Sequence, residues 1–454
     1  MNNKTPTPST VTASDSHVAT QDHTQNNRLL IIGYVWPEPN SSAAGTRMMQ
    51  LIELLQKQAW QITFASPAKL GEHKTDLSSL GIDEQLIELN SSSFDHFVHQ
   101  LQPGLVIFDR FMMEEQFGWR IEKQVPKAIR ILNTEDVHSL RAARQQMVKE
   151  ALNSSPQDTD LDSIPLHNPQ ALFEKMATSD LAKREIASIF RSDLTLMISE
   201  FECSLLQQQF QLPSQQLIYL PFLYKQPETE TRRPFEARQH FMTIGNFRHD
   251  PNWDAVLWLK QEIWPRIRQQ LPQAELHIYG AYPPKKATQL HNPQQGFKIM
   301  GWAEDAFEVL SQARMCLAPL RFGAGIKGKL AEAMLFGTPN ITTSVGSESM
   351  QIPGLATWSG QVANNSTDFA DQAVKLYQDA DLWRKAQQAG DHIMANRFLN
   401  RPEKTQPLLE AIHRLTTKLE AHRSANFIGA MLNHHHHKST QYMAQWIEAK
   451  NRVE

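Results

Sequence analysis

The 454-residue sequence has little cysteine, no long hydrophobic run and almost no net charge. Its two cysteines, Cys203 and Cys316, are too few for a disulfide framework, and two buried free thiols in a reducing compartment are expected. No apolar run approaches the roughly 20 residues that span a bilayer. A formal net charge of -3 does not force any face to be basic, which argues against a nucleic-acid partner.

The N-terminal region has almost no large apolar residues. Residues 1–27 are mostly Ser, Thr, Asn, Asp and His, without the apolar centre of a signal peptide. We therefore expect a disordered tail and a cytoplasmic location. Peripheral membrane contact stays compatible with this composition.

Apolar strand-like runs alternate with amphipathic helical patterns in two successive series. This alternation predicts parallel sheets with helices on both faces, an α/β architecture. The first series begins with RLLIIGY at Arg28–Tyr34, and the second begins with FMTIGNF at 241–247. Ligands of such sheets bind beyond the carboxyl ends of the strands. Two such domains are therefore expected to share a ligand cleft.

The boundaries follow from composition. Residues 225–234 are charged, contain two prolines and are the best candidate for an interdomain linker. Residues 153–168, rich in Ser, Pro and Asp, are expected to form an exposed excursion. We predict a tail over 1–27, a Rossmann-like domain over 28–225, a second Rossmann-like domain over 226–400, and C-terminal helices over 401–454 that pack back on the first domain.

A glycine-rich turn after a strand is the most informative segment. LAPLRFGAGIKGKLAEAMLFGTPNITTSVG, at Leu317–Gly346, predicts a strand, a turn, a helix and another strand. Arg321, Lys327 and Lys329 crowd the turn and the first helical residues, where the helix dipole disfavours positive charge. An anion held by these cations and by free backbone N–H groups would explain them. A glycine turn with solvated lysines is the alternative.

The same segment can bind a nucleotide. Gly323 and Gly325 would let the backbone approach a ligand closely, and Arg321 with Lys327 can hold a diphosphate. Glu332 lies about one turn into the helix, where its carboxylate can accept two hydrogen bonds from ribose hydroxyls.

This segment resembles the donor site of bacterial glycosyltransferases of family 4, also called group 1. RFGAGIKGKLAEAM and FGTPNITTSVGSES carry the resemblance, with IGNFRHDPNWDAV, Gly301–Trp302 and RLLIIGYVWPEPNSSAAGTR. It implies the GT-B fold, in which two Rossmann-like doubly wound domains face a central cleft. It also implies a hexosyltransferase-type enzyme of glycan biosynthesis. Such an enzyme moves a sugar from a nucleotide-sugar donor to an acceptor hydroxyl, with retention of configuration and without a metal.

The resemblance assigns roles to residues of the second domain. Without a metal, cations must stabilise the departing diphosphate, and Arg321 and Lys327 would take this catalytic role. Glu332 would hold the ribose. The other donor contacts would be Gly323, Gly325, Gly245 and Arg248 near the diphosphate and Trp302 near the base.

The first domain would form the acceptor or sugar side. Gly45 and Arg47 open a helix in NSSAAGTR, so a cation again lies at a positive helix end. A solvated arginine beside a glycine turn explains this pattern equally well. In TEDVHSLRAAR, Asp136 and His138 loosely match a family position that reaches the donor sugar. His138 is the third catalytic candidate and could donate to a sugar hydroxyl; an ordinary surface histidine is the alternative.

One position departs from the family pattern. The family often carries two glutamates eight positions apart; the later one matches Glu332, and Ala324 stands at the earlier one, which usually contacts the transferred sugar. The base, the sugar, the oligomeric state and the acceptor (glycan, lipid-linked or protein) stay open. So do two alternative functions, a non-catalytic GT-B partner subunit and a sugar-nucleotide 2-epimerase. The resemblance implies no metal or other cofactor, and no DxD-type pair lies where it could bind a metal. The consecutive side chains of His434–His437 do not make a closed tetrahedral site either.

Overall fold

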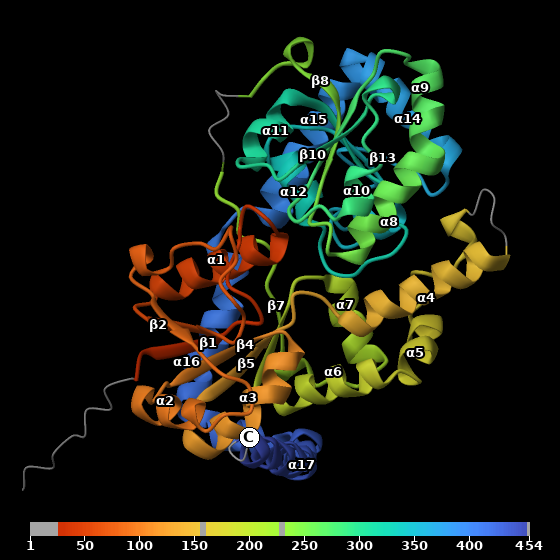
Figure 1. Cartoon of the computed structure of the whole chain (residues 1–454). Helices are drawn as coiled ribbons and strands as arrows, with labels where there is room; N and C mark the ends of the chain where they lie inside the picture. The colour runs from red at the N-terminus through yellow and green to blue at the C-terminus, as the bar shows by residue number, and fades with distance from the viewer. Residues whose placement is uncertain (1–25, 155–159, 227–231, 452–454) are drawn as a thin grey trace, which may run out of the picture.

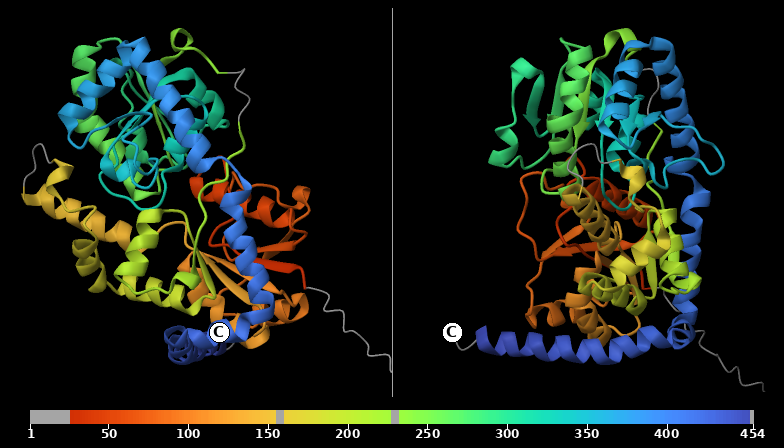
Figure 2. Two further views of the ribbon diagram at one scale, coloured as in Figure 1. Left: turned by 180° about the vertical axis from the view of Figure 1, so that it is seen from behind. Right: turned by 90° about the vertical axis from the view of Figure 1, so that its right-hand side faces the viewer.

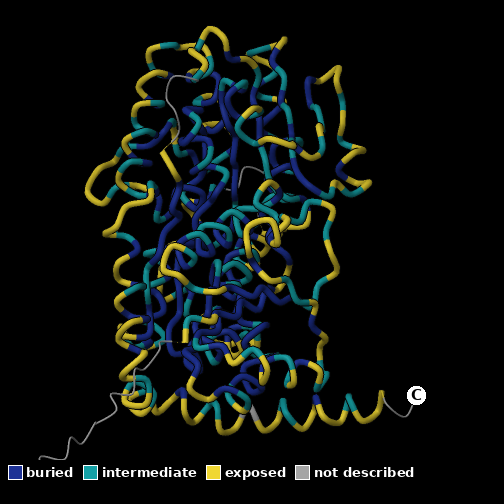
Figure 3. Tube along the Cα trace, turned by 90° about the vertical axis from the view of Figure 1, so that its left-hand side faces the viewer, coloured by how far each residue is buried: buried dark blue, intermediate teal, exposed yellow. Residues whose placement is uncertain are grey.

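The computed structural model describes residues 26–154, 160–226 and 232–451. Its strands form two parallel sheets, each covered by helices (Figure 1). Buried backbone is concentrated along the strands of both halves (Figure 3). The predicted α/β class with two doubly wound domains is confirmed. No helix among the described residues is long and apolar enough to cross a bilayer.

The first sheet has the order β3-β2-β1-β4-β5-β6-β7. Its strand order reverses beside β1, where Leu29 pairs with both Ile62 and Leu105. Central parallel strands are covered on both faces, which explains their unbroken apolar runs. The strands are β1 (Arg28–Ile32), β2 (Gln61–Ser66), β3 (Asp83–Leu86), β4 (Leu105–Asp109), β5 (Ile129–Asn133), β6 (Leu194–Met197) and β7 (Leu217–Tyr219).

The second sheet has the order β10-β9-β8-β11-β12-β13. Its order reverses between β8 and β11, which pair in parallel. Open α/β sheets bind their ligands beyond such reversals. The strands are β8 (Gln239–Ile244), β9 (Leu276–Tyr279), β10 (Phe297–Gly301), β11 (Ala313–Ala318), β12 (Asn340–Thr342) and β13 (Gly360–Val362).

Helices follow most of the strands. Those of the first half are α1 (Ala43–Gln56), α2 (Ser93–Leu101), α3 (Phe111–Gln124), α4 (His138–Ser154), α5 (Pro169–Ala177), α6 (Asp180–Arg191) and α7 (Glu200–Gln208). Those of the second half are α8 (Asp250–Trp258), α9 (Trp264–Gln270), α10 (Lys285–Thr288), α11 (Ala306–Gln312), α12 (Gly328–Leu335), α13 (Ser344–Ser347), α14 (Ser366–Gln378) and α15 (Ala380–Ile393). Short 3₁₀ turns include η1 (Ser78–Leu80), and two π-helical turns are η6 (Leu259–Ile263) and η8 (Met394–Phe398).

The C-terminal helices lie against the first domain. Helix α16 (Pro402–Ala425) returns along its sheet (Figure 2), and Leu408 and Ile412 are buried in the same cluster as Leu29. Helix α17 (Phe427–Asn451) packs against α3 and α6 at the base of this domain. Arg423 and Asp193 form an ion pair of 2.7 Å near the corner between the two helices.

Two expectations about local burial were wrong. Of the predicted exposed excursion, residues 155–159 lie outside the described residues, but Leu161 and Leu166 are buried in a cluster with Phe322 of the second domain. These two leucines supply the apolar anchors that the polar composition concealed. Cys316 is buried as expected, whereas Cys203 on α7 is partly exposed. Residues 1–25 of the predicted tail and residues 227–231 of the predicted linker lie outside the described residues.

Candidate functional site

The carboxyl ends of the two sheets line one cleft of about 700 Å³. The first domain contributes the segments after β1, β4 and β5. The second domain contributes the segments after β8, β9, β10 and β11, including the glycine-rich turn. The cleft therefore occupies the crevice where both sheets are expected to bind ligands.

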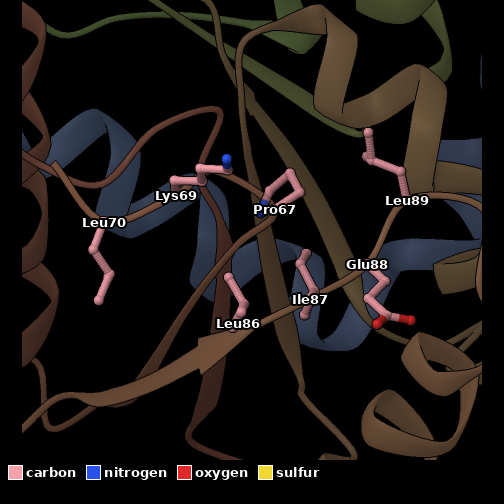
Figure 4. Close-up of a pocket in the computed structure, with 7 residues that line it drawn as sticks. All are labelled: Pro67, Lys69, Leu70, Leu86, Ile87, Glu88 and Leu89. Carbon is pink, nitrogen blue, oxygen red and sulfur yellow. The ribbon is translucent and has the colours of Figure 1, made fainter.

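A second pocket, of about 580 Å³, lies at the ends of β2 and β3 (Figure 4). Pro67, Leu70 and residues 86–89 form most of its wall, and Lys69 and Glu88 are its only ionisable residues. It contains none of the site residues predicted from the sequence. The interdomain cleft, with its many converging charged groups, is therefore the candidate active site.

The glycine-rich turn touches the first domain directly. Gly325 has a φ of 64°, and a Cβ atom there would lie 3.0 Å from the Asp136 Cβ atom. At Gly328 a Cβ atom would lie 2.4 Å from the Cβ atom of Ala43, at the start of α1. Gly325 is thus favoured both by its positive φ and by the contact between the domains, whereas Gly328 is required by the contact with Ala43. Ala324 lines the cleft and packs against the core of the first domain.

Two lysines bring positive charge to the start of α12. The Lys327 amine donates to the Gly325 carbonyl at 2.7 Å, and the Lys329 amine donates to Asn252 Oδ1 at 2.7 Å. Burial lowers the pKa of each lysine to about 8, with Glu348 opposing the shift at Lys327. No side chain caps the start of α12. The predicted anion-binding residues therefore lie together at one side of the cleft, and the free N–H groups of a helix start are suited to an anion.

The structure does not place Arg321 with these lysines. Its guanidinium donates to both carboxylate oxygens of Asp254, at 2.9 and 2.6 Å, and it does not line the cleft. The predicted catalytic role of Arg321 therefore needs correction, because Asp254 on α8 already satisfies its charge. Lys329 lies in the cleft instead.

The other donor-side residues line the cleft as a group. Burial raises the pKa of Glu332 to about 7 against the opposing charge of Lys329. A Cβ atom on Gly245 would lie 2.7 Å from Asn252 Cγ and 2.8 Å from the Lys329 amine, so a larger residue there would displace these two side chains. Arg248 is exposed and lies over the ring of Tyr282, at 3.9 Å. Gly323, Gly325 and Trp302 complete this side.

Trp302 contacts the opposite domain. Its ring stacks on His73, with centroids 3.9 Å apart and planes 13° apart, and it remains 37% exposed. The partly open aromatic face at the mouth of the cleft is suited to stacking on a planar ring.

Only some of the site residues predicted in the first domain line the cleft. Gly45, Asp136 and His138 line the cleft, but Arg47 does not. Arg47 is buried and donates to the Pro221 carbonyl at 3.0 Å. The expected anion contact of Arg47 therefore needs correction, since its side chain turns inward from α1.

Asp136 and His138 form one polar group. Burial disfavours the ionised form of Asp136, but the nearby guanidinium of Arg141 outweighs it and keeps the Asp136 pKa below its usual range. His138 Nε2 lies 3.4 Å from Asp136 Oδ1. Burial lowers the pKa of His138 to about 4, so its ring is neutral at pH 7. A neutral ring can donate to or accept from a sugar hydroxyl.

The sequence reasoning missed a pair of carboxylates. The Asn133 amide donates to Asp109 Oδ1 at 3.3 Å and to Glu135 Oε1 at 2.8 Å. Burial and the charge of Asp109 raise the pKa of Glu135 to about 8, and burial raises that of Asp109. Asp109 and Glu135 line the cleft directly after β4 and β5. The available signal was the change from an apolar strand to acidic residues in LVIFD and AIRILNTE.

Two residues of the first domain that line the cleft have a strained backbone. Arg110 and Glu135 have φ values of 72° and 64°, which cost on the order of 1–3 kcal/mol each for non-glycine residues. Such strain persists where the surrounding structure enforces it, and functional sites are the usual place. Both residues line the cleft.

Side chains of the first domain hold the glycine-rich turn in place. Arg144 on α4 pairs with both carboxylate oxygens of Glu348, at 2.9 and 2.6 Å, and donates to the Gly323 carbonyl at 2.9 Å. Glu202 on α7 accepts from the Gly325 N–H at 2.8 Å. The turn that carries the lysines is therefore fixed from both domains.

Comparison with known proteins agrees with this geometry. Residues 238–379 match the family model of the group 1 glycosyl transferases. HepE from Anabaena, solved with UDP and glucose, has a TM-score of 0.58 at 12% identity and covers 85% of this chain and 99% of its own. Sucrose-phosphate synthase from Thermosynechococcus elongatus has a TM-score of 0.59 at 15% identity and covers 86% and 99%. WaaG, a glycosyltransferase involved in lipopolysaccharide biosynthesis, has a TM-score of 0.53 at 11% identity and covers 84% and 98%. No curated protein matches the sequence.

These findings confirm the predicted resemblance to group 1 glycosyltransferases, the GT-B fold and the enzyme class. The family match lies within the second domain, which carries the lysines and Glu332. The likeness of the complete chain to solved structures, at 11–15% identity, establishes the fold.

Proposed function

We propose that the protein is a retaining, metal-independent glycosyltransferase that moves a hexose from a nucleotide-sugar donor to an acceptor hydroxyl. One observation carries the proposal: buried Lys327, partly buried Lys329 and the uncapped start of α12 all line the same GT-B cleft. Such a cleft suits a diphosphate, which would offset the cost of keeping a lysine buried.

The second domain would act on the leaving group. When the bond between the anomeric carbon and the phosphate oxygen breaks, its electron pair passes to the diphosphate. The added negative charge then develops beside Lys327, Lys329 and the first N–H groups of α12, which stabilise the transition state more than the ground state. Glu332 would accept hydrogen bonds from the ribose hydroxyls, and Trp302 would flank the base.

The first domain would position the sugar and the acceptor. Neutral His138 would donate to a sugar hydroxyl, and the backbone N–H groups of the glycine-rich turn would replace the glutamate missing at Ala324. For retention, we propose that the acceptor attacks from the face that the diphosphate leaves and that the diphosphate takes the acceptor proton.

A second candidate, a sugar-nucleotide 2-epimerase, is favoured by the Asp109 and Glu135 pair. An epimerase needs an acid and a base near the sugar, and two neighbouring carboxylates can divide these roles when one holds a proton. Product analysis separates the two functions, since an epimerase yields an epimer from the donor alone.

The test begins with binding. Thermal shifts with UDP, GDP, ADP and TDP identify the base, because a ligand of the native state raises the melting temperature. UDP-glucose is the first donor to test, since HepE was solved with it. Release of diphosphate in the presence of EDTA, with the product keeping the donor's anomeric configuration, would support the proposal. A lack of any stabilising nucleotide would overturn it. The cytoplasmic location stays a prediction.

A further inference from the structure

Helix α17 leaves one face without a partner. Its inner face is fixed to the first domain through buried Gly429 and Ala444, and Glu448 accepts hydrogen bonds from Ser92 N and Oγ at 3.1 and 2.5 Å. The helix has 25 residues, about 37 Å at 1.5 Å per residue. It runs along the base of the molecule and past its edge (Figure 2). Its outer face is mostly exposed (Figure 3).

This outer face is rich in large apolar side chains. They form two groups, residues 427–431 and residues 442–446, and the step of eleven residues from Met431 to Tyr442 is about three helical turns, so both groups lie on one side of the helix. The members and their exposures are Phe427 (77%), Ile428 (47%), Met431 (45%), Tyr442 (66%), Met443 (62%) and Trp446 (65%). An apolar patch of this kind on an otherwise folded protein marks an interaction surface.

The charged residues of α17 indicate the kind of partner that its outer face fits. No Asp or Glu occurs between residues 421 and 447, whereas His434, His435 and Lys438 are exposed on the outer face. Lys450 lies over the ring of Trp446, at 5.7 Å. A face with exposed aromatics, lysines and no acids complements an anionic lipid surface, where Trp and Tyr settle at the headgroup level.

A second copy of the chain fits this face poorly. In a two-fold dimer the same patch meets itself, so the lysines and histidines of one helix would approach those of the other without an acid between them. We propose that α17 binds an anionic membrane surface, with its outer face in the headgroup layer. Binding through α17 would hold the enzyme on the membrane whatever its acceptor is.

The test uses the full chain in sedimentation with vesicles. We expect the protein to pellet with vesicles of phosphatidylcholine and phosphatidylglycerol, more weakly with phosphatidylcholine alone, and less at high salt. The double variant Tyr442→Ser, Trp446→Ser should lower partitioning about tenfold or more, because it removes two aromatic rings from the interface. Leu355→Ser, which changes a 46% exposed leucine in the second domain, should bind as the wild type does.

Two control measurements show whether the double variant is still folded and still binds nucleotide. The double variant should keep the wild-type melting temperature and nucleotide binding, because both altered side chains are exposed and do not line the cleft. Failure to pellet with anionic vesicles, or equal pelleting of the double variant, would overturn the proposal. Self-association of the wild type that the double variant abolishes would also overturn it and assign the face to a second copy.

Discussion

The two walls of the cleft differ in charge, and each is built differently. The wall of the second domain combines a glycine-rich turn, a helix start and two lysines. The wall of the first domain carries Asp109, Glu135 and Asp136 at the ends of its strands, with Arg110 and Arg141 beside them. We call the wall of the second domain the cationic wall and that of the first domain the acidic wall. The cationic wall suits an anion such as a diphosphate, and the carboxylates of the acidic wall suit sugar hydroxyls.

The walls are also tied together. Arg144 and Glu202 of the first domain bond to the turn or to Glu348 of the second. The position of the cationic wall therefore depends on side chains of the first domain that do not line the cleft. We call these contacts of Arg144 and Glu202 the joint, and variants can separate its effects from those of the two walls.

The largest effect is expected from breaking the joint. Glu348→Ala should lower the free energy of unfolding by about 3–5 kcal/mol, because it leaves the buried Arg144 charge unpaired. Glu115→Ala, which breaks the exposed pair with Arg184, should cost less than about 1 kcal/mol. Urea unfolding followed by circular dichroism measures both variants. Equal losses would contradict a buried joint.

The joint should also depend on pH. Burial opposes ionisation of Glu348, but Arg144 outweighs it and lowers the Glu348 pKa in the folded state. The pair therefore stabilises the fold above the unfolded pKa of a glutamate, about 4.3, and this contribution is lost as the pH falls through the folded pKa.

The next effect concerns the cationic wall. Lys327→Met should lower kcat by about 10²–10³-fold, as the loss of one transition-state donor does, and should weaken donor binding less. Steady-state rates and calorimetric dissociation constants separate the two effects. Lys286→Met is the matched control, because this lysine lies over Trp253 and does not line the cleft. If Lys327→Met weakened donor binding without lowering kcat, Lys327 would have no catalytic role.

A smaller effect should distinguish the walls. Glu332→Ala should weaken donor binding by roughly 1.5–3 kcal/mol per lost charge-assisted hydrogen bond. Glu135→Gln, in the opposite wall, should leave the affinity for the free nucleoside diphosphate unchanged and lower turnover. Calorimetric titration of both variants with the same diphosphate tests this contrast. Unchanged binding by the Glu332 variant would take Glu332 out of the donor site.

The smallest effect is a change with pH. The pKa values of Lys327 and Lys329 are lowered to about 8, so both amines lose their charge as the pH rises through that value. The pKa of Glu332 is raised to about 7, so its carboxylate gains a proton as the pH falls below that value. The kcat/KM for the donor, which reports the free enzyme, should therefore be greatest between about pH 7 and 8. Lys327→Met should reduce the fall on the alkaline side, and an unaltered profile in this variant would exclude Lys327 as its source.

Much of the fold and of the second-domain site was predictable from local sequence. Apolar runs of strand length, alternating with helical patterns, determined two parallel sheets, because burial on both faces demands such runs. The glycines before a helix start determined where an anion could bind, and Lys327 and Glu332 lie in the cleft as their positions on that helix indicated.

Only the tertiary structure decided which charges face the cleft. Arg321 pairs with Asp254, 67 residues away, and Arg47 bonds to a carbonyl 174 residues away, so neither lines the cleft. Asn133 joins Asp109 and Glu135 from neighbouring strands, and Gly328 is required by Ala43 of the other domain. Local sequence determines the periodicity of strands and helices and the ends of helices. The partner of a buried charge is often distant in the sequence, and only folding brings the two side chains together.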